Sequence, residues 1–147
     1  MRYLAIDLGL RRTGLAVGDD VSAIVTPLSV IVTSHAGERM RGIAREIDRH
    51  GPAALVLGLP LNMDGTDGPA ALAVREFAVT LAKETALPVH LADERLSSVA
   101  ADAQMAQTGM THSQKKSRRD ALAAADILKR FIDSLPHRRA TSDEPRP

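Results

Sequence analysis

Carboxylates directly follow apolar runs of strand length at two places in the chain. Asp7 ends the run Tyr3–Ile6, and Glu94 lies just beyond the short run Pro88–Ala92. Ligands of open α/β sheets bind beyond the carboxyl ends of strands, so we expect these two side chains to converge if their strands run parallel. Two adjacent carboxylates repel each other unless they are protonated or bridged by a cation. Because oxygen ligands suit hard cations, the pattern predicts a Mg²⁺ or Mn²⁺ site, with turn capping as the ordinary alternative for Asp7.

The last helical segment offers a third carboxylate, and its periodicity favours Asp120 over Asp126. Asp120 lies four residues before Ala124 and seven before Ile127, so it projects along the apolar stripe near the start of the helix. Asp126 is two residues from Ala124, which places it on the opposite, solvent-facing side. Asp120 is therefore the residue that we expect to complete the carboxylate cluster, with an N-terminal helix cap as its alternative role.

Positive charge is concentrated beside these carboxylates. Arg11 and Arg12 stand in the glycine-bearing turn after Asp7, and the run 115–119 (KKSRR) directly precedes Asp120. Next to an acidic cluster such charges suit a phosphate-bearing polymer, whereas a solvated surface segment is the ordinary alternative. The turn-rich loop 59–69 adds polar groups that could hold a phosphate or a base edge. The candidate nucleic-acid contacts are Arg11, Arg12, Asn62, Arg95, Lys116 and Arg119.

Turn signals and hydrophobic periodicity place these residues on a mixed α/β sheet. Two strand-like runs flank Gly9–Gly14 and predict an antiparallel hairpin. The run 23–33 predicts a third strand, which Pro27 assigns to a sheet edge or a bulge. Three strands followed by helix–strand–helix–strand–helix indicate a mixed sheet in one domain. We expect further strands over 53–58 and 88–92, helices over 37–50, 70–85, 97–107 and 119–135, and a mobile polar segment over 109–116.

Composition limits the function classes that this chain can serve. Its 147 residues fit one domain, which we place at 1–135, with a disordered tail over 136–147. The absence of cysteine excludes disulfides, thiol catalysis and cysteine-based zinc sites. An aromatic content of 2% argues against rows of base-stacking side chains, and a net charge of +1 confines any nucleic-acid site to a local patch. Without a signal-peptide pattern or a membrane-length apolar stretch, we expect a cytoplasmic protein.

Four stretches, in this order, resemble the YqgF/RuvX group of RNase H-like nucleases, whose members are described as Holliday junction resolvases or pre-16S rRNA nucleases. They cover nearly the whole chain apart from the tail, and they read AIDLGLRRTGLAVGD (5–19), LVLGLPLNMDGTDGP (55–69), DERLSS (93–98) and KKSRRDALAAADIL (115–128). Arg11 stands where the family more typically has lysine, which keeps a basic group. Lys116 fits the lysine that usually precedes the last aspartate.

The resemblance implies an α/β, RNase H-like fold: a mixed five-stranded sheet, with three antiparallel strands followed by parallel ones, and helices on both faces. It also implies phosphodiester hydrolysis with divalent metal ions. By this resemblance Asp7 bridges the metal ions, and Glu94 and Asp120 complete their coordination. The substrate backbone is then held by the basic side chains Arg11, Arg12, Lys116 and Arg119, with Asn62 in contact from the opposite loop.

We therefore expect a Mg²⁺- or Mn²⁺-dependent endonuclease that processes the 5′ end of precursor 16S rRNA. A Holliday junction resolvase is the first alternative, and it needs a dimer to act symmetrically on a four-way junction. A non-catalytic nucleic-acid-binding module is the second, and a relative of the actin and hexokinase ATPases is the third, although those enzymes generally use two such domains. No side chain can be assigned to contacting a 2′-hydroxyl, so the choice between an RNA and a DNA substrate stays open. The choice between a monomer and a homodimer also stays open.

Overall fold

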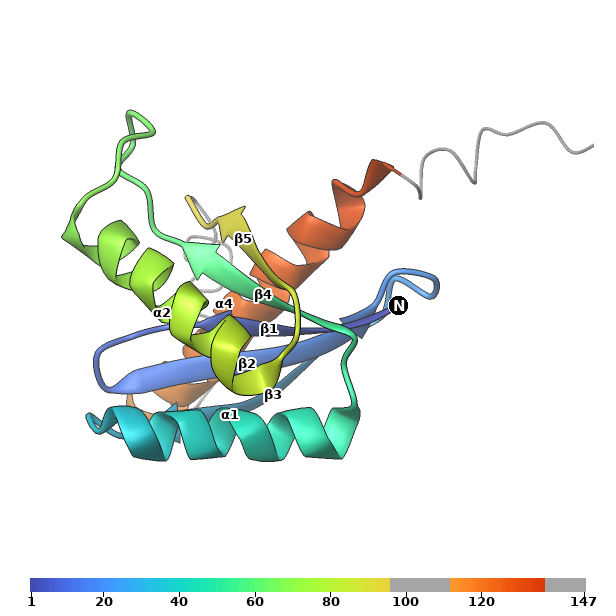
Figure 1. The fold of residues 1–147 in the computed structure, drawn as a ribbon, viewed down its shortest axis with the longest axis horizontal. Helices are drawn as coiled ribbons and strands as arrows, with labels where there is room; N and C mark the ends of the chain where they lie inside the picture. Colours follow the sequence, from blue (N-terminus) through green and yellow to red (C-terminus); the bar gives the residue numbers. More distant parts are fainter. Residues whose placement is uncertain (96–111, 137–147) are drawn as a thin grey trace, which may run out of the picture.

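A five-stranded mixed sheet forms the centre of the molecule, in the strand order β3-β2-β1-β4-β5 (Figure 1). The computed structural model describes residues 1–95 and 112–136, with only the backbone for 112–119. Its strands are β1 (Arg2–Asp7), β2 (Arg12–Asp19), β3 (Val25–Val32), β4 (Ala54–Leu59) and β5 (Val89–Asp93). Its helices are α1 (Ala36–His50), α2 (Pro69–Thr85) and α4 (His112–Asp133). The prediction of a mixed α/β sheet with helices on both faces is confirmed.

Strand direction follows from the connections between the strands. β1, β2 and β3 are joined by short turns and pair antiparallel, whereas β1, β4 and β5 are joined through helices and pair parallel. Pro27 lies in β3, an edge strand of the described sheet, and pairs with Ala16 beside a register shift in β2. Because proline has no N–H to donate, both predicted consequences, an edge and a bulge, occur together.

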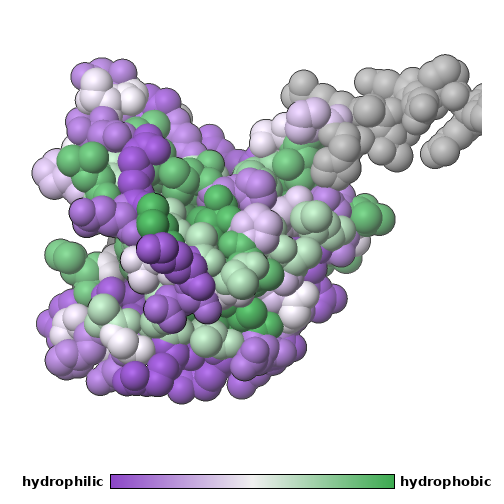
Figure 2. Space-filling view, in the orientation of Figure 1, coloured by the Kyte–Doolittle hydropathy of each residue, from purple (hydrophilic) through white to green (hydrophobic). Residues whose placement is uncertain are grey.

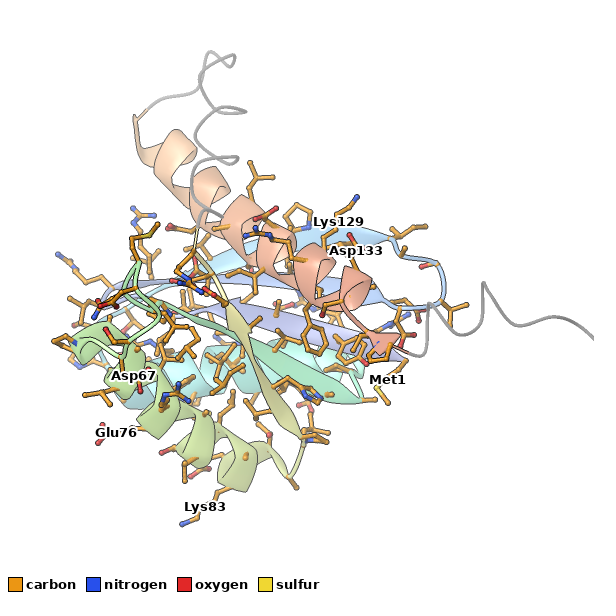
Figure 3. All side chains as sticks on the ribbon, turned by 90° about the horizontal axis from the view of Figure 1, so that it is seen from above. Met1, Asp67, Glu76, Lys83, Lys129 and Asp133 are labelled. Carbon is orange, nitrogen blue, oxygen red and sulfur yellow. The ribbon has the colours of Figure 1, made fainter. Side chains whose placement is uncertain are left out.

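Two hydrophobic cores lie on opposite faces of the sheet. Helices α1 and α2 pack on one face through a cluster that includes Ile43 and Leu81, and α4 packs on the other through Ile127 and Leu128 (Figures 1 and 3). Side chains of a strand alternate between faces, so β1 sends Leu4 and Ile6 to the first core and Tyr3 and Ala5 to the second. β4 is buried along its whole length, as expected of a central strand covered on both faces.

Helix α4 begins at His112, seven residues before the predicted start at Arg119. The prediction of a mobile polar segment reaching Lys116 is therefore wrong for residues 112–116, which are helical. The polar composition of this stretch is compatible with a solvent-facing helical turn, which periodicity alone does not reveal. The predicted helix over 97–107 and the tail beyond Pro136 lie outside the described residues.

The end of β1 opposite to Asp7 is held by the second acidic residue of the Asp19–Asp20 pair. Asp20 is 6% exposed, and its carboxylate accepts a hydrogen bond of 2.9 Å from the amino group of Met1. Burial of a carboxylate is tolerated when it is paired in this way. Asp20 thus stabilises the sheet, away from the candidate site. None of the described helices combines the length and apolarity that crossing a membrane requires.

Candidate active site

Parallel pairing of β1, β4 and β5 brings the two predicted carboxylates to one edge of the sheet. Ile6 pairs with Leu57 and Leu59 pairs with Asp93, so all three strands end at the same level. Glu94 follows β5 directly, and its N–H donates to the carbonyl of Leu59 over 3.2 Å. The side chains of Asp7 and Glu94 lie within hydrogen-bond reach of each other above the intervening strand β4.

Gly58 makes this approach possible. It is the position of β4 that lies between Asp7 and Glu94, and a Cβ atom there would overlap the Glu94 carboxylate and stand 2.7 Å from Cδ1 of Ile127. Real Cβ atoms do not come so close to other heavy atoms. Because position 58 has no side chain, the Glu94 side chain can occupy the space above it and approach Asp7.

Asp120 joins this pair from the α4 side. Ala5 faces α4, and Asp7, two residues further along β1, faces the same way. Asp7 pairs in register with Gly14 on β2, and a Cβ at position 14 would overlap the backbone carbonyl of Asp120. The backbone of α4 at Asp120 thus packs directly against the backbone of β2 beside Asp7. The half-buried Asp120 carboxylate is close enough for its charge to act on Asp7.

The proximity of these acids changes their protonation. Burial raises the pKa of Asp7 to about 8, and the charges of Glu94 and Asp120 add to this effect. Burial also raises the pKa of Glu94, but the hydrogen bond from Asp7 works in the opposite direction. Burial, the neighbouring charges and the hydrogen bond with Glu94 all favour the protonated form of Asp7. A second negative charge so close to the first is disfavoured.

The donor set of this cluster fits a hard cation, since it consists of carboxylate oxygens alone. Within residues 1–95 and 120–136, no group of three or more His, Asp or Glu side chains is spaced to hold a metal ion as it stands. The raised pKa of Asp7 favours its protonated form, which is a poorer cation ligand than a carboxylate. Cation binding at this cluster would have to displace that proton.

A cavity of about 510 Å³ opens beside the acids and is lined by Gly9, Leu10, Arg11, Arg12, Val32 and Asp120. The structure thus brings together Asp120 and the two arginines of the first turn, which the sequence places more than 100 positions apart. Arg11 is exposed and Arg12 is half-buried. A cavity that combines a carboxylate with two guanidinium groups could hold a phosphate group next to the acidic cluster.

Asn62 and Arg95 lie in or against the loop after β4, and both are engaged within the protein. The Asn62 side-chain amide donates to the Thr66 hydroxyl over 2.9 Å. Arg95 pairs with Asp93, with Nε 2.8 Å from a carboxylate oxygen, and donates to the carbonyl of Met63 over 3.1 Å. This pairing holds the pKa of the Asp93 carboxyl below its ordinary value. Arg95 therefore ties the loop to the end of β5.

Comparisons with known proteins identify the family to which this chain belongs. The family model described as "RuvX: Holliday junction resolvase" matches residues 1–134. The chain belongs to the RuvX family. A relative from Anaeromyxobacter sp. (strain Fw109-5), named "Putative pre-16S rRNA nuclease", is 42% identical over 133 residues, which cover 90% of this chain and 97% of the relative. A relative of the same name from Acidiphilium cryptum (strain JF-5) is 37% identical, covering 99% and 88%.

Solved structures extend the likeness of this RuvX-family chain to its fold. RuvC of T. thermophilus, solved with a Holliday junction substrate, superposes with a TM-score of 0.57 at 18% identity, covering 91% of this chain and 97% of that one. The Fowlpox virus resolvase, solved with substrate Holliday junction DNA, gives 0.58 at 13% identity, covering 92% and 99%. At such identities the likeness concerns architecture, and it establishes the RuvC-like, RNase H-like fold.

Two of the predicted contacts cannot be placed in this RuvX-family structure. Lys116 and Arg119 belong to the first two turns of α4, and their side chains lie outside the described part of the chain. Only the backbone course of these turns is defined, and it leads directly into Asp120.

Three residues of the site were not found by sequence reasoning. Gly14 and Gly58 give the carboxylates room, and the alternation Gly14-Leu15-Ala16-Val17-Gly18 is a usable signal, because small residues at every second position mark a strand face that another element approaches closely. Arg39 of α1 donates to the carbonyls of Leu10 and Thr33 over 2.9 and 3.3 Å and so fixes the first turn. Nothing in the pattern of an amphipathic helix distinguishes this arginine from its neighbours.

Proposed function

We propose that this chain is a divalent-metal-dependent endonuclease that hydrolyses phosphodiester bonds of precursor 16S rRNA, at its 5′ end. The observation that carries the proposal is the convergence of Asp7, Glu94 and Asp120 beside a cavity that two arginines line. The names of the curated relatives supply the substrate. Carboxylates repel a phosphate group bound next to them unless a cation lies between the two. The proposal therefore includes metal dependence.

Asp7, Glu94 and Asp120 would hold Mg²⁺ or Mn²⁺. When bound, such an ion supplies an activated water and stabilises the leaving oxygen of an in-line displacement. The protein's own part is to place three carboxylates on rigid elements, two at strand ends and one on a helix packed against the sheet. Arg11 and Arg12 bind the phosphate backbone at the rim of the cavity. Asp7 would have to lose its proton to serve as a ligand, so metal affinity would rise with pH.

Holliday junction DNA is the second candidate substrate. The description of the family model and the junction-bound structures with the same fold favour it. A junction has two-fold symmetry, so symmetric cleavage requires two copies of the chain. A precursor rRNA end requires only one.

The deciding experiment is a cleavage assay on two labelled substrates, a four-way DNA junction and an RNA that spans the precursor 5′ end of 16S rRNA. Wild type is compared with Asp7→Asn and with a matched pair on α4, Asp120→Asn and Asp126→Asn. Each protein is assayed with Mg²⁺, Mn²⁺ or EDTA.

We expect RNA cleavage, and we expect EDTA to abolish it. Asp7→Asn and Asp120→Asn should reduce the cleavage rate by at least ~100-fold, whereas Asp126→Asn should keep the wild-type rate. Cleavage of the junction alone would transfer the activity to DNA recombination. Binding of RNA without cleavage under any metal condition would replace the nuclease by a non-catalytic binding module.

A further inference from the structure

A second hollow lies between the edge strand β3 and helix α1. It has a volume of about 490 Å³, and its lining includes Val32, Thr33, Arg41 and Arg45. Val32 also lines the cavity beside Asp120, so the two hollows adjoin at the end of β3. Val32 is the residue that the two linings have in common.

The acidic and the basic side chains of this second hollow differ in whether they have a partner within the protein. Its two acids already have partners: Glu38 accepts from the Thr33 hydroxyl over 3.0 Å, and Glu46 pairs with Arg49 and His50 at 3.4 and 3.2 Å. Arg41 and Arg45 are exposed, and within the described part of the chain neither guanidinium group makes an ion pair. Arg41 and Arg45 are therefore the groups of this hollow that an added anion can pair with, although the exposed Glu38 keeps its charge, since a hydroxyl partner does not neutralise it.

Arg41 and Arg45 are one helical turn apart, so both project from the same side of α1, roughly 6 Å from each other along the axis. The outer surface over α1 is strongly hydrophilic (Figure 2). Neighbouring cationic side chains at a regular spacing suit a repeating anion, such as a nucleic-acid backbone, better than a single compact ligand.

Arg39 connects the two hollows mechanically. Its guanidinium group lies on α1 between them and donates to the carbonyl of Leu10 in the first hollow and of Thr33 in the second. The N–H of Thr33 in turn donates to the carbonyl of Arg11 over 2.8 Å. Hydrogen bonds therefore hold the first turn, which lines the first hollow, against Thr33, which lines the second.

We propose that the nucleic-acid substrate extends from the carboxylate cluster over Val32 into the groove between β3 and α1, where Arg41 and Arg45 bind backbone phosphates away from the scissile bond. This inference rests on the proposed nuclease function and adds a second contact region to it. The ligand is the sugar–phosphate backbone, which both RNA and DNA offer.

The test measures binding of a labelled single-stranded RNA of about 20 nucleotides by fluorescence anisotropy, over a series of KCl concentrations. All proteins carry Asp7→Asn, so that RNA is not cleaved in the presence of Mg²⁺. The test variant adds Arg41→Ala and Arg45→Ala, and a second variant replaces both arginines by lysine. The matched control adds Lys83→Ala and Lys129→Ala, which removes two exposed charges from α2 and α4 (Figure 3).

We expect the double alanine variant to bind more weakly, and the slope of log K against log[salt] to become shallower by roughly 1.4, since each phosphate contact on a single strand contributes about 0.7. The lysine variant and the control should keep the parent slope. An unchanged slope in the alanine variant would overturn the inference, and so would an equal change in the control, which indicates net charge rather than a site. The Asp7-containing wild type, assayed for cleavage in parallel, separates this failure from a failure of the proposed function.

Discussion

The Glu94 carboxylate lies above Gly58, in the space that a side chain at position 58 would fill. Gly58 lies on β4, between Asp7 on β1 and Glu94 after β5, so the ends of three neighbouring strands meet at this point. The atoms that a new side chain would meet are the ends of flexible side chains, not backbone. They can move aside, so the fold and the acidic cluster can be perturbed separately.

Gly58→Ala should therefore fold but displace Glu94 from Asp7. Overpacking of this kind costs about 1–3 kcal/mol of unfolding free energy, which thermal or urea unfolding measures. Metal-dependent cleavage should fall much more steeply than stability. Gly37→Ala in the first turn of α1, where a Cβ would come no closer than 3.4 Å to the side chain of Arg41, is the matched control and should keep both. A Gly58→Ala protein with full activity would show that the position of Glu94 is unimportant.

Asp7→Asn should stabilise the protein, and more so at higher pH. The pKa of Asp7 is raised to about 8 in the folded state, so between pH 4 and 8 the folded chain keeps a proton that the unfolded chain releases. The free energy of unfolding of wild type then falls as pH rises through this window. Asparagine removes that dependence, so we expect a gain in the free energy of unfolding that is clear at pH 8 and nearly absent at pH 4. Urea unfolding at both values measures this, with Asp48→Asn on the exposed side of α1 as control.

Arg39→Ala should loosen the turn that carries Arg11 and Arg12. It removes the charged hydrogen bonds to the carbonyls of Leu10 and Thr33, at a cost of about 1–3 kcal/mol. We expect faster amide hydrogen exchange over residues 9–12 and a raised KM for nucleic acid. Arg41→Ala, on the same helix without these bonds, should leave exchange in the turn unchanged. Equal exchange in wild type and Arg39→Ala would assign Arg39 no positioning role.

Arg95 could either hold the loop after β4 or contact the phosphate backbone, and removing its partner Asp93 distinguishes these two roles. Asp93→Ala breaks the ion pair but leaves the guanidinium group in place, whereas Arg95→Ala removes the link to Met63 as well. If Arg95 acts by holding the loop, both variants should weaken substrate binding, Arg95→Ala more than Asp93→Ala. Direct contact of Arg95 with the phosphate backbone would instead make Asp93→Ala bind as tightly as wild type or more tightly. Binding isotherms in the Asp7→Asn background distinguish the two.

Much of the sheet could be predicted because its signals are local. The apolar runs before Asp7 and after Gly14 form the hairpin, Pro27 lies in an edge strand beside a bulge, and the apolar run of β4 is buried throughout. The start of α4 could not be placed, since its first turns carry no apolar stripe. The candidate site residues themselves stay predictions, but the structure does bring Asp7, Glu94 and Asp120 together.

The sequence alone determined which groups exist and where along each element they fall: one carboxylate at the end of β1, another after β5 and a third on α4. Only the tertiary structure decided their mutual distances, the raised pKa values of Asp7 and Glu94, and the contact of Arg39 with a turn 29 positions away. The physical reason is that periodicity and turn chemistry act over a few residues. Desolvation and coulombic coupling depend on distances in space, which chain order does not fix.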